Sequence, residues 1–392
     1  MYSNVIQNMK SSKNPNKLIK FNEPFIIGDE MFHLKNCIND KNLIGPNNYI
    51  KKCETLLEKQ LLCKKVLLTN SGTDALEMAC ILANFGLNDE IIMPSFNFPS
   101  SATAVLRCGA KPVFVEIDKE TMNISPDAIE KSITKNTRGI IIVHYAGIAC
   151  DLKKILKLVK KYSLILIEDA AHAIYSKYGD QYLGTFGDFA ILSFHQTKNI
   201  FCGEGGALLV NKKKYIERSF IIRDKGTNRR AFINGKVSKY KWVDIGSSFI
   251  PSSLQASFLF TQLKNGKKIT RKRVKVFKEY HKFFLKLKNN KISLPSFNKK
   301  NSINGHFYWI LIDKNKRDLF IKNALSNNLE LTSHYETLHN SIAGKKFSIT
   351  YSNLDKSSFF SKQLIRIPIH TGMNEKKINF VISTLTKLLK TI

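Results

Sequence analysis

Residues 189–210 read FAILSFHQTKNIFCGEGGALLV, in which two apolar runs flank a polar, glycine-rich segment. The runs FAIL and ALLV have the length and composition of buried strands. Lys198 follows the first of these runs, close to Ser193. An ammonium group at the end of a buried strand loses hydration, so a lysine is an unfavourable structural choice there unless its amine reacts. The stretch therefore predicts a reactive lysine at the end of a strand.

Similar apolar runs recur on both sides of this stretch, separated by segments with apolar residues at helical spacing. The predicted strands are 66–69, 90–93, 111–117, 139–143, 164–168, 189–194 and 207–210. The first predicted helix follows residue 69 and ends near Gly86, and another begins at Ser125 and Pro126. Continuous apolar strands that alternate with helices predict an α/β fold whose mainly parallel sheet has helices on both faces. Ligands of such sheets bind beyond the carboxyl ends of the strands.

This alternation weakens beyond about residue 250. A long basic helical stretch, from LQASFLFTQLKN to VFKEYHKFFLKL, precedes the apolar runs ISLP, HFYWILI and RIPI. We therefore expect a flexible N-terminal tail (1–20), a large domain (21–255), and a connecting helix with a small C-terminal α+β domain (256–392).

Two of the predicted strand ends carry residues with two interpretations each. Ser71-Gly72-Thr73 opens a helix after the first strand, where backbone N–H groups could hold a phosphate or the serine could simply cap the helix. Phe98 follows the second strand and could stack on a planar ligand or pack in the core.

The two other strand ends carry ionisable groups. Asp169 and His172 follow the strand 164–168, and a buried carboxylate there needs a cation, either a protonated ring nitrogen or a side chain of the protein. Ser193 and Lys198 bring a hydroxyl and an amine to the same edge. Together the four strand ends offer a phosphate site, a ring contact, a carboxylate and an amine, which are the groups needed to hold pyridoxal 5′-phosphate.

Composition narrows the classes of function. The formal charge of +31 over 392 residues is compatible with nucleic-acid binding, but the lysines are spread along the chain without a recognition motif, which favours a solvated basic surface. Seven cysteines, none in a Cys-x-x-Cys arrangement, argue against a disulfide framework or a metal site. No apolar stretch approaches the ~18 residues of a membrane helix, and the first twenty residues lack a secretory pattern. We expect a cytoplasmic protein that binds neither membrane nor specific nucleic acid.

Seven motifs occur in an order similar to that of the DegT/DnrJ/EryC1/StrS sugar-nucleotide aminotransferases, a fold-type-I group that depends on pyridoxal phosphate. The motifs are SGTDALEMA, MPSFNFPSSATAV, GAKPVFVEID, VHYAG, IEDAAHA, SFHQTKN and GEGGAL. The resemblance runs from about Phe21 to the C-terminus. It implies a fold-type-I transferase whose mainly parallel sheet has seven strands.

The resemblance also implies roles for individual residues. Lys198 would bond covalently to the cofactor, Asp169 would pair with its ring nitrogen, and Phe98 would stack on its ring. The implied phosphate ligands are Gly72, Thr73 and Ser193. The implied site also includes His172 and His195, whose roles the resemblance leaves open.

The substrates and assembly follow from the same resemblance. The implied amino donor is L-glutamate, and the implied acceptor is a nucleotide-linked keto sugar. KGTNRR, SHYETLH and RIPIHTGM favour amination of dTDP-4-keto-6-deoxy-D-glucose, with other UDP, GDP or dTDP sugars and the C3 position left as alternatives. The implied assembly is a homodimer. Many relatives reach the neighbouring subunit's phosphate with Asn or Arg where this chain has Ile250, so that contact is either lost or passes to Ser247 or Ser248.

Overall fold

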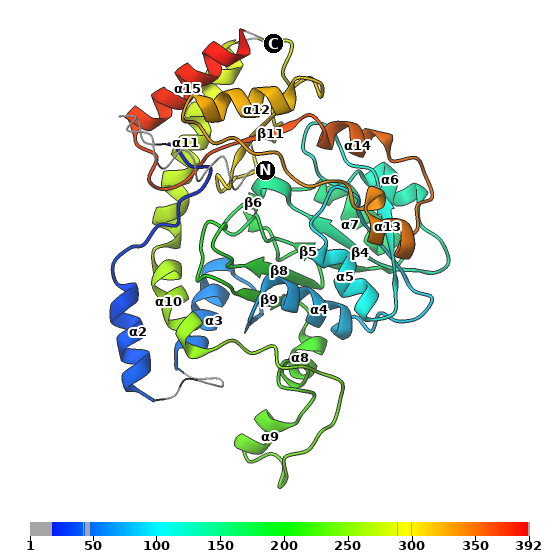
Figure 1. Cartoon of the computed structure of the whole chain (residues 1–392). Coiled ribbons are helices and arrows are strands. Elements are labelled where there is room, and N and C mark those ends of the chain that lie inside the picture. The colour runs from blue at the N-terminus through cyan, green and yellow to red at the C-terminus, as the bar shows by residue number, and fades with distance from the viewer. Residues whose placement is uncertain (1–17, 42, 44–47, 288, 299, 391–392) are drawn as a thin grey trace.

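The computed structural model describes residues 18–390 apart from 42, 44–47, 288 and 299, and its centre is one seven-stranded sheet (Figure 1). The strands of this sheet are β1 (Lys65–Thr69), β2 (Glu90–Pro94), β3 (Lys111–Val115), β4 (Thr137–Val143), β5 (Ile165–Asp169), β8 (Phe189–Ser193) and β9 (Gly206–Val210). They lie in the order β1-β9-β8-β5-β4-β2-β3, with β9 antiparallel to both its neighbours and the other described pairings parallel. The predicted mainly parallel sheet is confirmed.

Helices cover both faces of the sheet because successive side chains of each strand point to opposite sides. In β1, Leu67 packs into one apolar cluster, whereas Val66 and Leu68 pack into the other. The helices on the Leu67 side are α4 (Gly72–Leu82), α5 (Ser100–Arg107) and α8 (Ile216–Arg223). The helices on the opposite side are α3 (Asn48–Leu61), α6 (Pro126–Lys131), α7 (Leu152–Lys161) and α10 (Ser253–Lys264).

One predicted helix boundary is confirmed and another is wrong. Helix α6 begins as predicted, with the Ser125 hydroxyl accepting a hydrogen bond from the Ala128 N–H at 3.4 Å and Pro126 in the first turn. Helix α4 ends at Leu82, before the predicted stop at Gly86. Asn84 already takes a left-handed conformation (φ 54°), which ends the helix without a glycine.

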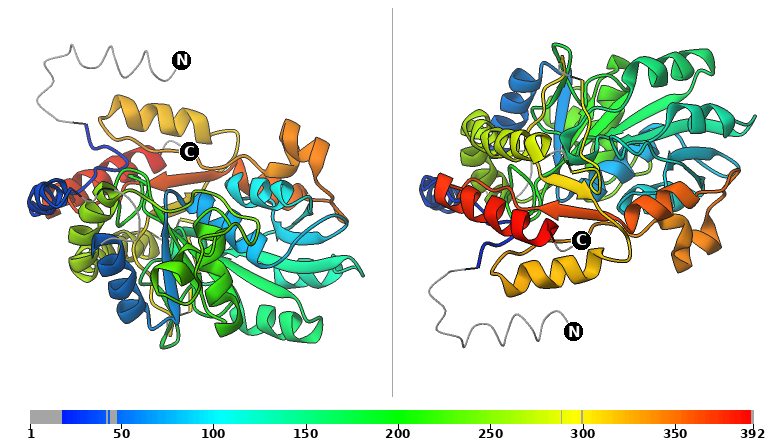
Figure 2. Two further views of the ribbon diagram at one scale, coloured as in Figure 1. Left: turned by 90° about the horizontal axis from the view of Figure 1, so that it is seen from below. Right: turned by 90° about the horizontal axis from the view of Figure 1, so that it is seen from above.

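A third apolar cluster lies in the C-terminal part of the chain. Helix α11 (Gly266–Leu287) leads into it, and its other elements are β10 (Tyr308–Leu311), β11 (Leu364–Ile367), α12 (Arg317–Ser326) and α15 (Glu375–Leu389). Strands β10 and β11 form an antiparallel pair, and Figure 2 shows α12 and α15 on the same side of the molecule as β11. The remaining α-helices and strands are α2 (Glu30–Asn39), β6 (Lys177–Tyr178), β7 (Gln181–Tyr182), α9 (Arg229–Ile233), α13 (Ile342–Phe347) and α14 (Asp355–Ser361). The division at residue 255 stays a prediction.

The expected N-terminal tail is only partly within the described residues. Residues 1–17 lie outside them, but Ile19 is buried, its N–H donates to the Asn328 carbonyl at 2.9 Å, and it pairs with Leu329. The packed chain therefore begins before residue 21, because an apolar side chain joins the C-terminal cluster. None of the helices in the described part of the chain has the length and apolar character needed to cross a bilayer.

Candidate active site

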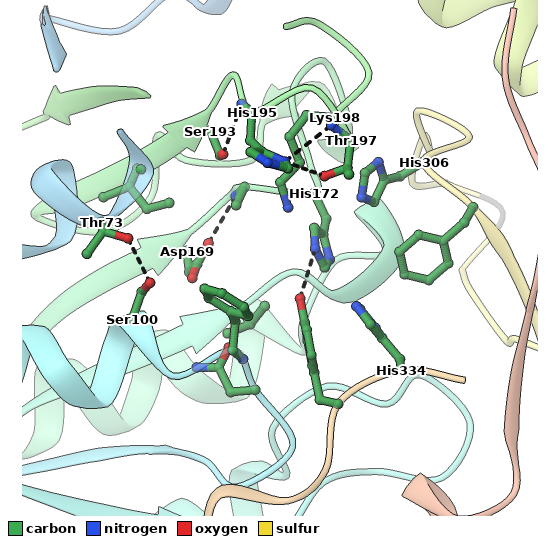
Figure 3. A pocket seen from close by; sticks show the side chains of 18 of the residues that line it. Thr73, Ser100, Asp169, His172, Ser193, His195, Thr197, Lys198, His306 and His334 are labelled. Carbon is green, nitrogen blue, oxygen red and sulfur yellow. Dashed lines mark hydrogen bonds between the residues drawn. The ribbon is translucent and has the colours of Figure 1, made fainter. Parts of the chain in front are cut away.

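A cavity of about 490 Å³ lies at the carboxyl ends of the parallel strands, bounded on its other side by the C-terminal part of the chain. It is lined by every residue predicted for the site, namely Gly72, Thr73, Phe98, Asp169, His172, Ser193, His195 and Lys198. Figure 3 shows the side chains of Asp169, His172 and Lys198 converging on one space, with Thr73 and Ser193 beside it. The four strand ends chosen from the sequence therefore meet in one place.

The start of α4 forms a small polar pocket in this wall. Ser71 caps the helix, with its hydroxyl accepting from the Asp74 N–H at 3.1 Å, and the Thr73 and Ser100 hydroxyls lie 2.7 Å apart. A Cβ added to Gly72 would lie 3.1 Å from the Ser193 Cβ, so Ser193 would have to move by a few tenths of an ångström to accommodate a side chain there. Hydroxyls and the positive end of the helix dipole together suit a phosphate. The helix cap and the phosphate site are thus compatible, since Ser71 performs the first role.

Asp169 ends β5 as a buried carboxylate with few partners. Its Oδ1 accepts from the Ala171 N–H at 3.0 Å and its Oδ2 from the Ser101 hydroxyl at 3.4 Å. Burial raises the pKa of Asp169, and the Ala171 hydrogen bond and the Lys198 charge oppose that rise. No Lys, Arg or His nitrogen among the described residues lies within ion-pair distance of this carboxylate. A protonated heterocycle would supply the cation that Asp169 lacks.

Lys198 reaches the cavity from the turn after β8. Its backbone N–H donates to the His195 carbonyl at 2.8 Å, and the next residue, Asn199, donates from its side chain to the Asn304 carbonyl at 3.1 Å. Removal from water lowers the pKa of Lys198 to about 8, Asp169 opposes this, and the positive charge of Arg366 adds to it. A lysine in these surroundings is partly uncharged near neutral pH and can act as a nucleophile.

Aromatic side chains surround the remaining space. His172 is buried, its Nε2 lies 3.3 Å from the Tyr335 hydroxyl, and its ring centroid is 4.5 Å from that of His306. Burial holds the pKa of His172 well below its usual range, so the ring is neutral. Phe98 is 55% exposed at the cavity wall, with its ring 6.0 Å from that of Tyr335. A half-exposed phenyl ring and a neutral imidazole can both contact a planar ligand.

Comparison with known proteins shows what kind of enzyme has this arrangement. The model of the DegT/DnrJ/EryC1/StrS aminotransferase family matches residues 25–386. The chain belongs to this family. It is 31% identical over 354 residues to an uncharacterized protein of Methanocaldococcus jannaschii, covering 88% of this chain and 91% of that one. It is 30% identical to GDP-perosamine synthase of Escherichia coli O157:H7 over 296 residues, which are 75% of this chain and 77% of that enzyme.

Solved structures give the same fold. Helicobacter pylori PseC, an aminotransferase involved in the biosynthesis of pseudoaminic acid, matches with a TM-score of 0.87 and 25% identity over 96% of this chain and all of that one. The aminotransferase TlmJ of Streptoalloteichus hindustanus matches with a TM-score of 0.88 and 22% identity over 95% of this chain and 99% of that one. The predicted fold-type-I transferase and the predicted aminotransferase class are confirmed.

Enzymes of the DegT/DnrJ/EryC1/StrS family depend on pyridoxal phosphate, as predicted for this chain. The cavity fits the cofactor on three counts: a glycine backbone at a helix start, a buried carboxylate without a cation, and a lysine of lowered pKa. The buried His172 Nδ1 also has no hydrogen-bond partner among the described residues, so it could accept a hydrogen bond from a bound ligand or donate one to it.

Sequence reasoning missed the C-terminal side of the cavity. The side chains involved are Arg273, His306, Phe307, His334, Tyr335 and Arg366. His334, Tyr335 and Arg366 lie in two of the stretches that carry the resemblance, SHYETLH and RIPIHTGM, but were given no role. Arg273 had a signal of its own, since it falls at helical spacing with the buried Ile269 and Val276 of α11. A cation on the apolar side of a helix indicates a polar site within the core.

Ile250 packs against the apolar cluster that contains Val66 and Leu68 of its own chain. Ser248 is tied to the same chain as well, because its carbonyl accepts from the Asn70 side chain at 3.0 Å. How these residues meet a neighbouring subunit stays a prediction.

Proposed function

We propose that this aminotransferase moves the amino group of L-glutamate to the C4 keto group of dTDP-4-keto-6-deoxy-D-glucose. The products are 2-oxoglutarate and dTDP-4-amino-4,6-dideoxy-D-galactose, a precursor for surface polysaccharide. One observation supports the reaction class: this chain belongs to the family, and in its cavity Lys198, with a pKa lowered to about 8, lies opposite the buried Asp169. The choice of sugar is supported by the stretches KGTNRR, SHYETLH and RIPIHTGM.

Six of the predicted residues have a task in this proposal. Lys198 would hold the cofactor covalently, Asp169 would face its ring nitrogen, and Phe98 would contact its ring. Gly72, Thr73 and Ser193 would bind its phosphate at the start of α4. When bound, pyridoxal phosphate supplies an electron sink for the electron pair released at the amino-acid α-carbon.

Lys198 also moves the proton. The Lys198 Nζ would take the proton from the donor's α-carbon in the first half-reaction and deliver a proton to the sugar C4 in the second. A pKa of about 8 suits both directions, because the amine is readily protonated and readily deprotonated near neutral pH. Asp169 stays ionised during these steps because a cation beside it favours the carboxylate.

A GDP-linked keto sugar is the second candidate, because one relative of 30% identity is named GDP-perosamine synthase. The two candidates differ in the nucleotide, and no described contact of the cavity selects a base.

The decisive experiment is incubation of the purified, cofactor-loaded protein with L-glutamate and a set of dTDP-, GDP- and UDP-linked 4-keto and 3-keto sugars. Mass spectrometry and NMR then identify each product. An amine at C4 on the dTDP sugar is the expected result. Turnover of the GDP sugar alone would transfer the assignment to the second candidate, and no amine on any keto sugar would refute both.

We also propose that the working enzyme is a homodimer. Segment 226–245, which extends from the body beyond α8 (Figure 1), exposes a group of apolar side chains that a partner subunit would cover. They are Phe232, Ile233, Val237, Tyr240, Trp242, Val243 and Ile245, and Trp242 is 80% exposed. Light scattering should give twice the chain mass of 44.7 kDa. Trp242→Glu should shift that mass toward the monomer, whereas Leu87→Glu, at a residue that is 83% exposed elsewhere, should not.

A further inference from the structure

Two guanidinium groups in the cavity wall have no acidic partner. Arg273 comes from α11 and Arg366 from β11, and both line the same cavity as Lys198. No Asp or Glu oxygen among the described residues lies within 4.0 Å of either guanidinium. Within the lining, Asp169 and Glu204 are the acidic residues, and Glu204 instead lies 3.5 Å from His195 Nε2. With Lys198 and Asp169 assigned to the cofactor, the two arginines are left as positive charges without a task.

Arg273 is the more deeply buried of the two, with 4% of its surface exposed. Its Nε donates to the Gly305 carbonyl at 3.1 Å and its Nη2 to the His306 carbonyl at 2.6 Å. Burial lowers the pKa of Arg273 to about 9, which is what an uncompensated buried cation should show. Backbone carbonyls hold this side chain in place but leave its charge unneutralised.

Arg366 is held in one orientation by contacts on several sides. Its Nε and Nη2 both donate to the Ser333 carbonyl, at 3.0 and 2.8 Å. Its guanidinium carbon lies 4.6 Å from the ring centroid of Phe21 and 5.4 Å from that of Phe307. Arg366 lines the same cavity as Lys198, and its positive charge helps to lower the pKa of that amine. The Nε and Nη2 edge of the guanidinium is used by the Ser333 carbonyl, so the Nη1 and Nη2 edge is the one left to a carboxylate.

We propose that Arg366 binds the α-carboxylate of the amino donor and that Arg273 binds its side-chain carboxylate. The inference rests on the proposed use of L-glutamate and names the residues that select it. The α-carboxylate is bonded to the reacting carbon, so its anchor must line the same cavity as Lys198, and Arg366 does so from β11. Arg273 is the more deeply buried guanidinium and is held by the Gly305 and His306 carbonyls, so we assign it the other end of the donor. A nucleotide diphosphate fits Arg366 less well, because several bonds separate it from the sugar C4.

Binding of an unreactive dicarboxylate by the cofactor-free protein tests this proposal independently of catalysis. Glutarate should bind in calorimetry, and butyrate, with one carboxylate, should bind at least about 10-fold more weakly. Arg366→Gln and Arg273→Gln should each weaken glutarate binding by about 10- to 100-fold. Arg138→Gln, at an exposed arginine near the start of β4, should leave it unchanged. Because Arg273 is buried, Arg273→Lys is made as a second variant at this position, since it keeps the positive charge and loses only the planar guanidinium. Thermal melting checks that both Arg273 variants are folded.

The donor half-reaction then separates the two anchors. With cofactor-loaded protein, L-glutamate and the monocarboxylic donor L-alanine are compared by the change in cofactor absorbance. Arg366→Gln should slow both donors, whereas Arg273→Gln should slow glutamate and leave alanine unchanged. Unaltered glutarate affinity in both folded variants would overturn the proposal. So would weaker binding of dTDP or GDP by Arg366→Gln with glutarate unaffected, which would assign the arginine to the nucleotide. If glutarate binding depends on the arginines but glutamate fails as donor, the proposed donor is wrong and the dicarboxylate site stands.

Discussion

The cavity has two walls that differ in origin and in charge. The strand-end wall comes from the turns after β1, β2, β5 and β8, and it carries one cation and one anion, the Lys198 amine and the Asp169 carboxylate, which lie beyond ion-pair distance of each other. The C-terminal wall comes from α11, β11 and the segments 305–307 and 333–335, and it holds two arginines without acids. Balanced charges fit a resident cofactor, whereas unbalanced cations fit an anionic substrate that comes and goes. The difference between the walls therefore separates cofactor binding from substrate selection.

Lys198→Ala is the strongest test of the strand-end wall. Loss of the amine removes both the covalent link and the proton carrier, so turnover should fall by about 10⁴-fold or more. Turnover of glutamate and keto sugar is measured together with cofactor content after borohydride reduction, which should fix label at residue 198 in the unaltered protein only. Lys160→Ala, an exposed lysine in the last turn of α7, is the control and should keep full activity. Undiminished turnover in Lys198→Ala would remove the lysine from its role.

Asp169→Asn tests the role of the carboxylate in the strand-end wall. The substitution keeps the shape but removes the charge that stabilises a protonated ring, so kcat should fall by about 10²- to 10³-fold while cofactor still binds. Stopped-flow absorbance of the glutamate half-reaction measures the slow step. Asp180→Asn, on an exposed turn, should leave the rate alone. A near-normal half-reaction in Asp169→Asn would show that the carboxylate is only structural.

The same division explains what the sequence could predict. The strand-end wall was predictable because short apolar runs mark buried strands, and parallel strands deliver the residues that follow them to one edge. Asp169 and Lys198 could thus be brought together without knowledge of the loops. The C-terminal wall depends on how α11 and β11 pack across the sheet, and local pattern does not encode that placement. Among the many exposed cations of α11, Arg273 differs only in lying on the buried side.

Gly72→Ala tests the phosphate site at the start of α4. The added Cβ would lie 3.1 Å from the Ser193 Cβ, so the two strand-end turns would have to move apart. Cofactor affinity, measured by fluorescence titration of the cofactor-free protein, should weaken by about 10-fold. Gly86→Ala is the matched control, since nothing lies within 4 Å of its added Cβ. Equal affinities in the two variants would place the phosphate elsewhere.

The smallest expected effect links the two walls through the pKa of Lys198. Only the uncharged amine attacks an aldehyde, so the rate of cofactor uptake by the cofactor-free protein should rise with pH up to about 8 and then level. Arg366 is a cation that lowers this pKa, so Arg366→Gln should raise it and slow uptake at pH 7 by about 2- to 5-fold. Asp169 acts in the opposite sense, so Asp169→Asn should lower the pKa and speed uptake at pH 7. Uptake is followed by stopped-flow absorbance between pH 6 and 9, where all three proteins should converge at high pH. If Arg366→Gln leaves the inflection in place, the C-terminal wall does not act on the lysine, and the two walls are electrostatically independent.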